Sequence, residues 1–302
     1  MNWYKNMPPI DFSSKRMVQI EDFDGALRPM DEPYFKAELL AENTWQILSD
    51  GDYSYLLAGD ADTLLIDSGY GCGSIRKFCE ELTGRPVRRI ANTHAHFDHT
   101  ANNYLFDVAY MSKEAYPARC NPNRSFAGLA FPDDYPVEII DEGYVFHLGG
   151  RDVEVYKFSD HSPGSLAFLD RKTRLFFTGD ELVAENYRCR TSLDHSYEMV
   201  RKFKALQPYY DTLCAGPGIF PASLVDEYME AFAYLLANED SGEPQLPAFP
   251  PAPAPDGEHR AVYLRRLARP CDVGTRPDPD FAFKRELRYK GRVIEYWTNK
   301  LH

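Results

Sequence analysis

The chain has 302 residues, of which 44% are hydrophobic and 26% charged, and this globular composition excludes wholesale disorder and fibrous repeats. Acidic residues outnumber basic ones by 46 to 34, and the formal net charge of −12 argues against a nucleic-acid partner, because phosphate binding needs a cationic surface. No apolar run approaches the ~20 residues of a membrane span. The first thirty residues lack the apolar core of a secretory signal. We therefore expect no membrane partner and a cytoplasmic location, with the six cysteines as reduced thiols.

The chain is expected to begin with an irregular arm, residues 1–33, followed by one main domain, residues 34–243. Its predicted elements, in chain order, are β-rich runs within 34–68, a helix over 71–82, a strand over 87–92, a β-rich block within 137–177, a helix over 197–206, a strand over 213–215 and an amphipathic helix that Ser223 caps. Two similar halves, each a sheet covered by helices, predict a four-layer αββα sandwich of the α/β (α+β) class.

Two further segments follow the main domain. Residues 244–256 are predicted to be a linker, because six of the twelve residues 244–255 are proline. Residues 257–302 form an extension with 11 basic and 6 acidic residues, and it ends in a predicted β-hairpin over 281–297. An isolated hairpin is marginal in water. Either the main domain or a second copy of the chain, as in a homodimer, is expected to cover its aromatic face.

A cluster of four potential metal ligands follows the strand over 87–92. His94, His96, Asp98 and His99 lie within six residues in an HxHxDH pattern. Residues two apart on extended chain point to the same side, so His94 and His96 can face one cation together. Asp98 and His99 lie on the turn beyond and can face a second position. Imidazole and carboxylate are ligands that zinc, iron and manganese accept.

Three further motifs accompany the histidine cluster. They are the strand ending Leu64-Leu65-Ile66-Asp67-Ser68-Gly69, the turn Asp160-His161-Ser162-Pro163-Gly164-Ser165 and the segment Leu175-Phe176-Phe177-Thr178-Gly179-Asp180. In order and spacing, the four motifs resemble those of the metallo-β-lactamase superfamily over residues 35–237. This resemblance implies the αββα fold and a metallohydrolase activity.

The resemblance also implies a role for each matching residue. His94, His96 and His161 would hold a first ion, and Asp180 would bridge to a second ion held by Asp98 and His99. Asp67 would orient ligands through hydrogen bonds. The expected cofactor is zinc, as one or two ions, with iron or manganese as alternatives.

One family motif is broken in this sequence. Pro217 stands where the family's last metal-binding histidine is expected, and proline has no side-chain donor atom. Three outcomes are open: a single ion, a second ion held weakly, or a substitute ligand, for which His195 and Cys214 are the candidates.

The leading functional hypothesis is metal-dependent hydrolysis of a small acyl-type substrate, an ester, lactone, thioester or amide. The cation would lower the pKa of a water towards ~7 to supply the attacking hydroxide, and Asp98 would orient it and move a proton. The alternatives are a mononuclear iron redox enzyme of the same fold and a non-catalytic binding protein with a decayed site. A nuclease role fits the acidic charge least. Residues 116–136 are a candidate lid, and residues 183–196, with Tyr187, Arg188 and Arg190, a candidate pocket wall.

Overall fold

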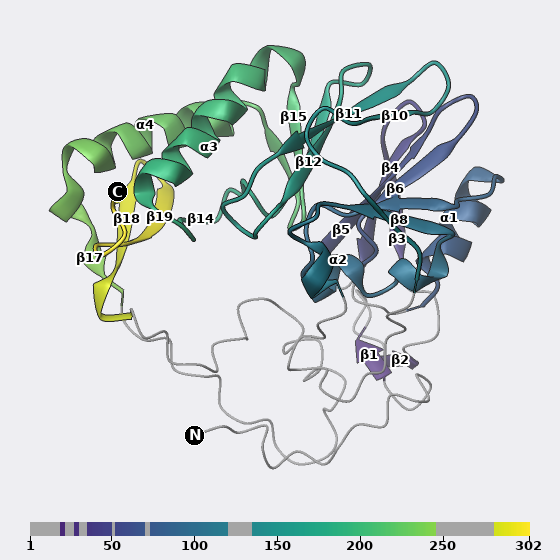
Figure 1. Cartoon of the computed structure of the whole chain (residues 1–302), viewed down its shortest axis with the longest axis horizontal. Helices are drawn as coiled ribbons and strands as arrows, with labels where there is room; N and C mark the ends of the chain where they lie inside the picture. Colours follow the sequence, from purple (N-terminus) through teal and green to yellow (C-terminus); the bar gives the residue numbers. More distant parts are fainter. Residues whose placement is uncertain are drawn as a thin grey trace.

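The computed structural model describes residues 19–21, 27–29, 35–49, 52–69, 73–119, 135–245 and 281–302. In this described part, two large β-sheets pack face to face, and helices cover their outer faces (Figure 1). The predicted αββα sandwich is confirmed.

The first sheet has the strand order β3-β4-β5-β6-β7-β8-β9. Strands β3 to β6 form an antiparallel meander, and β6 to β9 run parallel. The bounds are β3 Lys36–Ala41, β4 Thr44–Ser49, β5 Asp52–Ala58, β6 Thr63–Ile66, β7 Arg89–Ala91, β8 Val108–Met111 and β9 Val137–Ile139. Helices α1 (Ile75–Thr83) and α2 (Phe97–Thr100) belong to the same half.

Strand β6 is buried on both faces, which explains its apolar run Leu64-Leu65-Ile66. Leu64 and Ile66 pack against the second sheet, whereas Leu65, between them, packs against the layer that contains α1. The alternation follows from the two-residue period of a strand. The strand therefore ends in a rigid position just before Asp67.

The second sheet has the strand order β10-β11-β12-β13-β15-β16, antiparallel except for the parallel pair β13 and β15. The bounds are β10 Val145–His147, β11 Asp152–Lys157, β12 Leu166–Asp170, β13 Leu175–Gly179, β15 Thr212–Ala215 and β16 Ile219–Pro221. Phe177 faces the first sheet, and Phe176 faces the layer formed by α3 (Leu193–Leu206) and α4 (Leu224–Ala237).

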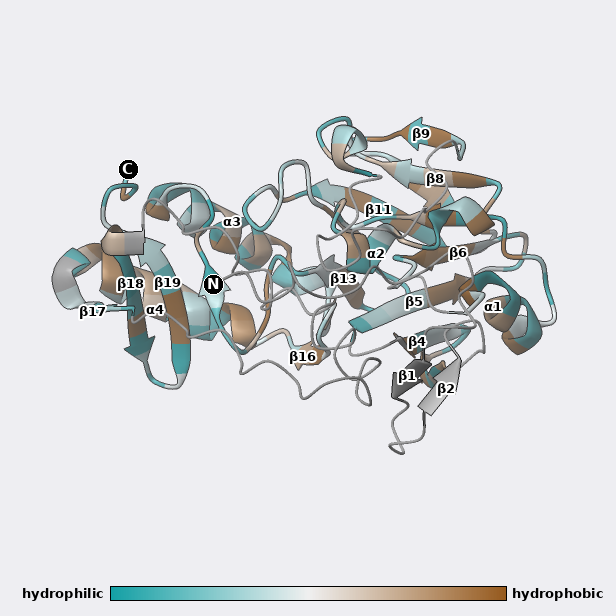
Figure 2. Ribbon diagram, turned by 90° about the horizontal axis from the view of Figure 1, so that it is seen from below, coloured by the Kyte–Doolittle hydropathy of each residue, from teal (hydrophilic) through white to brown (hydrophobic). Residues whose placement is uncertain are grey.

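A third, smaller sheet attaches the C-terminal hairpin to the domain. Its order is β14-β19-β18-β17, with β14 Tyr187–Arg188, β17 Glu243–Pro244, β18 Lys284–Tyr289 and β19 Arg292–Trp297. The apolar side chains Leu287, Ile294 and Tyr296 pack into the same core as α4, which is hydrophobic over much of its length (Figure 2). The hairpin was expected from the sequence, and the main domain covers its apolar face. A homodimer stays a prediction that the hairpin itself does not require.

The helix boundaries differ from the predicted ones at their starts. Helix α1 begins at Ile75, because Ser74 is its N-cap and accepts the N–H of Lys77. Helix α3 begins at Leu193 instead of residue 197, with Ser192 as the N-cap. Ser223 is the N-cap residue of α4, as predicted, but its side chain makes no capping hydrogen bond.

The remaining elements are short. They are the strand pair β1 Gln19–Glu21 and β2 Leu27–Pro29, and the 3₁₀ helices Asn103–Leu105, Tyr116–Ala118, Gln207–Tyr209, Glu239–Ser241 and Phe281–Phe283. Most of the predicted arm, linker and lid lies outside the described residues. Among the helices described, none combines the length and the apolar character needed to cross a membrane.

Candidate metal centre

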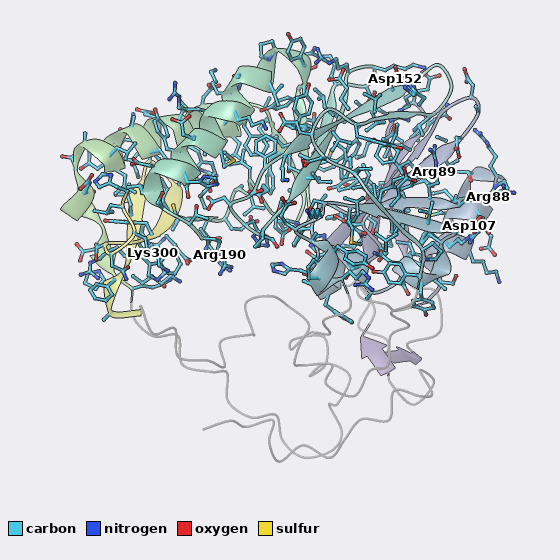
Figure 3. The ribbon with its side chains drawn as sticks, viewed as in Figure 1. Arg88, Arg89, Asp107, Asp152, Arg190 and Lys300 are labelled. Atoms are coloured by element: carbon cyan, nitrogen blue, oxygen red, sulfur yellow. The ribbon has the colours of Figure 1, made fainter. Side chains whose placement is uncertain are left out.

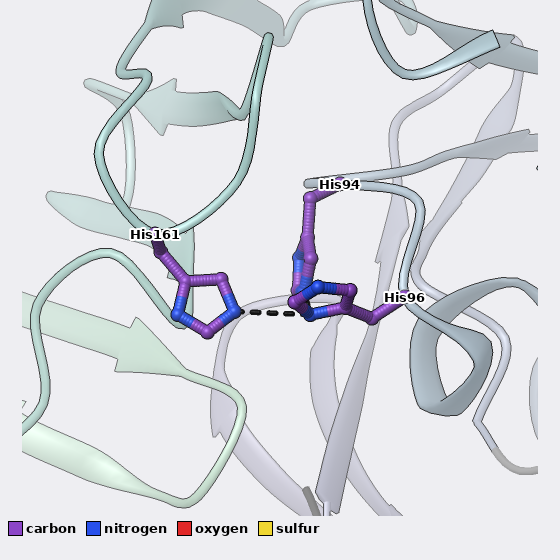
Figure 4. Close-up of side chains that lie close together, drawn as sticks. All are labelled: His94, His96 and His161. Carbon is purple, nitrogen blue, oxygen red and sulfur yellow. Dashed lines mark hydrogen bonds between the residues drawn. The ribbon is translucent and has the colours of Figure 1, made fainter. Parts of the chain in front are cut away.

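Three histidine side chains from two different sheets meet at one end of the sandwich. His94 and His96 follow β7, and His161 lies on the loop between β11 and β12. His96 Nδ1 is 2.8 Å from His94 Nε2 and 3.0 Å from His161 Nε2, and the three rings turn towards one another (Figure 4). One ring nitrogen from each residue lies within 4.8 Å of the others. The three nitrogens are therefore close enough to bind one cation together.

Desolvation by the surrounding protein keeps these three imidazoles neutral, including that of His96, which is partly exposed to solvent. It lowers the pKa of His96 to about 4 and that of His161 to about 3, and it lowers the pKa of His94 well below its ordinary value. A metal ligand must be the neutral form of histidine, because the protonated ring has no free lone pair. The cluster is thus in its ligand form at neutral pH.

A second group of donors lies beside the first, around His99. His99 Nε2 is 3.6 Å from Asp180 Oδ1 and 3.8 Å from Asp98 Oδ2, and Asp180 Oδ2 is 3.6 Å from His161 Nε2. Asp180 therefore presents one oxygen to each group, which is the arrangement of a bridging ligand.

Several atoms of this second group that could bind a metal ion have no hydrogen-bond partner among the described residues. They are Asp98 Oδ2, His99 Nε2 and Asp180 Oδ1, and all three are buried. A buried polar atom without a partner costs about 1–3 kcal/mol. A cation in contact with these atoms would remove that cost, so the residues present fit bound metal ions.

The charge state of the second group is coupled to cation binding. Burial opposes protonation of His99, but the carboxylates of Asp67, Asp98 and Asp180 outweigh it and raise the pKa of His99 well above its ordinary value. Burial also raises the pKa of Asp98 to about 8. A cation bound here would displace protons, so we expect its affinity to rise with pH.

Asp67 holds His99 directly, and His94 through Thr93, by hydrogen bonds. Its carboxylate accepts the backbone N–H of Thr93 at 2.8 Å and the hydroxyl of Thr93 at 2.7 Å, and it lies 2.9 Å from His99 Nδ1. The Thr93 hydroxyl in turn lies 3.0 Å from His94 Nδ1. Asp67 has a φ of 60°, a left-handed conformation that aspartate and asparagine tolerate best among residues with a side chain.

Replacing Asp67 by asparagine is expected to weaken metal binding at His99 by about 10–100-fold, because an amide nitrogen donates where the carboxylate must accept. Asparagine tolerates the same φ, so the variant should fold. Zinc titration of the metal-free variant and of wild type, carried through the second equivalent of zinc, measures the effect on the ion at His99. Asp60→Asn, which removes an exposed carboxylate beyond the far end of β5, is the control. Equal affinities for wild type and Asp67→Asn would show that Asp67 does not orient the ligands.

Two carboxylates that sequence reasoning missed hold the loop of His161. Glu181 accepts the backbone N–H groups of Asp160 and His161 at 3.1–3.3 Å, and its burial raises its pKa to about 7. Asp160 Oδ1 accepts the backbone N–H of Arg190 and the N–H and hydroxyl of Thr191. Both carboxylates are sequence neighbours of predicted ligands, and this adjacency is the signal that could have revealed them.

The turn that carries Pro217 approaches the site without offering a ligand. Pro217 is exposed between β15 and β16. The preceding Gly216 donates its N–H to Gly179 O at 3.0 Å and lies so close to Asp180 that a Cβ would stand 2.3 Å from Asp180 Oδ1. The turn therefore packs closely against the second donor group. Its residues Gly216 and Pro217 have no side-chain atom that could bind a metal ion.

Neither substitute ligand suggested by the sequence joins a donor group among the described residues. His195 lies inside the first turn of α3 instead of before the helix, and its Nε2 is 3.3 Å from Ser159 O. Cys214 is fully buried in the core between the sheets, where burial raises the pKa of its thiol. Asp52 is found in their place: one of its oxygens lies within 4.8 Å of donor atoms of Asp98 and His99.

The candidate pocket wall is only partly as expected. Tyr187 is buried in the core against Tyr228 and Phe232, so its predicted place in the pocket is wrong. Arg190 is exposed (Figure 3), and its positive charge acts on His96 and His161. Arg190 is therefore the cation of this segment that faces the histidine cluster.

Comparison with known proteins identifies the family. Residues 50–209 match the Metallo-beta-lactamase superfamily, and the chain belongs to this family. Among solved structures, the subclass B3 metallo-β-lactamase BJP-1 of Bradyrhizobium japonicum covers 70% of this chain with a TM-score of 0.53 and 20% identity, over 95% of its own length. A metallo-β-lactamase from Pontibacter korlensis covers 66% with a TM-score of 0.53 and 15% identity, over 99% of its own length. These likenesses show the fold.

The chain also matches curated proteins, but over only part of their length. An atrochrysone carboxyl ACP thioesterase of Aspergillus fumigatus is 26% identical over 67% of this chain and 56% of its own length. The acyl-coenzyme A thioesterase MBLAC2 of Homo sapiens is 25% identical over 42% and 56% of the two chains. A hydroxyacylglutathione hydrolase of Mesorhizobium japonicum is 30% identical over 44% and 49%. The chain spans about half the length of the curated relatives it matches.

Proposed function

We propose that this chain is a metal-dependent hydrolase of small acyl substrates, with thioesters as the preferred class. The observation that carries the proposal is the convergence of three neutral imidazoles from two sheets at a site that is open on one side. His94 is buried, whereas His96 is exposed at the mouth. Three protein ligands with one open position are typical of catalytic zinc sites, whereas structural sites are closed by a fourth ligand.

The proposed cofactor is zinc, which three imidazoles suit. When bound, zinc lowers the pKa of a coordinated water towards ~7 and polarises a substrate carbonyl. While no second cation is bound, Asp98 is the group that would orient the attacking water and move a proton, because its Oδ2 is buried and has no partner among the described residues. Asp67 and Glu181 would hold the ligands in place through the hydrogen bonds given above.

Thioesters are favoured within the acyl class by two considerations. The relatives from Aspergillus fumigatus and Homo sapiens are named as thioesterases of an acyl carrier protein and of acyl-coenzyme A. Carriers of this kind bear phosphate groups, and Arg190 would offer them a cation beside the histidines.

The proposed location of the protein is the cytoplasm. The buried free thiols of Cys79, Cys189 and Cys214 agree with this location.

The proposal is tested by measuring thiol release from acyl-coenzyme A esters of several chain lengths and from an acylglutathione, with a simple ester, a lactone and a β-lactam in parallel. We expect turnover of thioesters, its loss after chelation and its return on adding zinc. Turnover that is unaffected by complete metal removal would contradict the proposal. Oxygen uptake by iron-loaded protein, without hydrolysis of any substrate, would favour the redox alternative.

A further inference from the structure

The second donor group lacks the histidine that Pro217 replaces, yet the same turn is tied to the start of β5. The carbonyl of Gly216 accepts the backbone N–H of Tyr53 at 2.8 Å. Asp52 directly precedes Tyr53 and is the first residue of β5. The hydrogen bond therefore places Asp52 beside the turn where the family ligand is missing.

The register of the first sheet brings Asp52 to the same edge as the other donors. Tyr55 pairs with Ile66 in the antiparallel pair β5 and β6, so the start of β5 lies beside the end of β6, where Asp67 follows. An oxygen of Asp52 and donor atoms of Asp98 and His99 all lie within 4.8 Å of one another.

Two members of this group, Asp98 and His99, have buried potential ligand atoms that lack a partner in the described part of the chain. Asp98 is 5% exposed and His99 is fully buried, and Asp98 Oδ2 and His99 Nε2 have no hydrogen-bond partner among the described residues. Within 3.6 Å of the same His99 nitrogen lies Asp180 Oδ1, which is likewise unsatisfied. Three acidic side chains around one imidazole, with these atoms unsatisfied, are the groups that a cation would bind.

We infer that Asp52 takes the place of the missing histidine and holds a second cation together with Asp98, His99 and Asp180. This inference rests on the proposed metal site, because Asp180 is shared with the group of His94, His96 and His161.

The two positions would differ in metal preference. The first would offer three imidazole nitrogens, which suit zinc, whereas the second would offer three carboxylates and one imidazole. Carboxylate oxygens suit harder cations such as manganese. The use of Asp52 in place of the missing histidine therefore predicts a mixed centre, with zinc at the first position and Mn²⁺ at the second.

The inference is tested with full-length protein that is stripped of metal, loaded with one equivalent of zinc and then titrated with Mn²⁺. Bound Mn²⁺ is followed by the loss of the free-ion electron paramagnetic resonance signal, and both metals are counted by elemental analysis. Wild type is expected to hold one zinc and one Mn²⁺. Asp52→Asn should keep the zinc and bind Mn²⁺ at least about 10-fold more weakly, since even indirect partners of a metal are worth 10–100-fold.

Asp60→Asn is the matched control, because it makes the same chemical change at an exposed position beyond the opposite end of β5, and it should bind both metals as wild type does. Wild-type Mn²⁺ affinity in Asp52→Asn would overturn the inference. So would a wild-type protein that takes up zinc but no second ion, while the proposed function would stand. Failure to bind the first zinc would instead overturn the proposed function.

A second variant tests whether positions 52 and 217 exchange roles. Pro217→His in the Asp52→Asn background returns an imidazole to the turn. It should restore the second ion and shift its preference from Mn²⁺ towards zinc. A double variant that binds the second ion no better than Asp52→Asn would contradict the exchange.

Discussion

Replacing His161 by alanine is expected to remove the first metal ion and to lower thioester turnover by more than about 100-fold, because loss of a direct ligand should exceed the 10–100-fold cost of losing an outer partner. The loop itself should stay in place, since Glu181 binds the backbone N–H groups of Asp160 and His161 and does not depend on the imidazole. The loss can then be assigned to the ligand and not to misfolding.

Metal content by elemental analysis and thiol release with the best thioester measure this effect. The control is His147→Ala, an exposed histidine on β10 that pairs with Asp152 outside the donor groups. It should retain wild-type metal content and rate. A His161→Ala protein that keeps both would show that this imidazole is not a ligand.

Replacing Arg151 by methionine is expected to destabilise the fold by about 3–5 kcal/mol, which is the usual cost of removing one partner from a buried ion pair. Arg151 and Asp170 are buried, and their side chains are joined at 2.6 Å. The same guanidinium crosses to the first sheet and donates to Thr44 Oγ1, Asn43 O and Ala58 O. Its loss would leave Asp170 charged in the core and break the polar link between the sheets.

Chemical denaturation measures this change. Arg174→Met is the control, because it breaks an equally short ion pair with Asp211 on the surface, and its midpoint should stay close to that of wild type. Removing the charge on both sides, with Arg151→Met and Asp170→Asn, should recover part of the lost stability. Equal midpoints for the Arg151→Met and Arg174→Met proteins would contradict a structural role for the buried pair.

The sequence predicts the family and the αββα layers because each motif is a short, contiguous segment of the chain. Each ligand of the predicted set follows a strand end, so the spacing along the chain reports the spacing across the sheet. The structure brings His94, His96 and His161 together, with Asp98, His99 and Asp180 beside them. Their roles as ligands stay predictions.

Asp52 could not be predicted in the same way. In the sequence it belongs to the polar turn Asp50-Gly51-Asp52, and only the pairing of β5 with β6 and the contact between Tyr53 and Gly216 bring it to the site. Contacts between distant segments of this kind leave no periodic signal in the chain.

The early start of α3 has a similar cause. The backbone N–H groups of Leu193 and Asp194 donate to the carbonyls of Lys300 and Leu301, near the end of the chain. The third sheet places these carbonyls at the helix start, where N–H groups lack partners within the helix. Hydrophobic periodicity, which begins to be visible at residue 197, does not report this support.

The measurement that tests the central claim most directly is crystallography of zinc-loaded protein, with diffraction data collected on both sides of the zinc absorption edge. We expect an anomalous peak about 2.0–2.1 Å from one nitrogen each of His94, His96 and His161. A fully zinc-loaded crystal with no peak between these rings, or with the rings turned away from one another, would contradict the account.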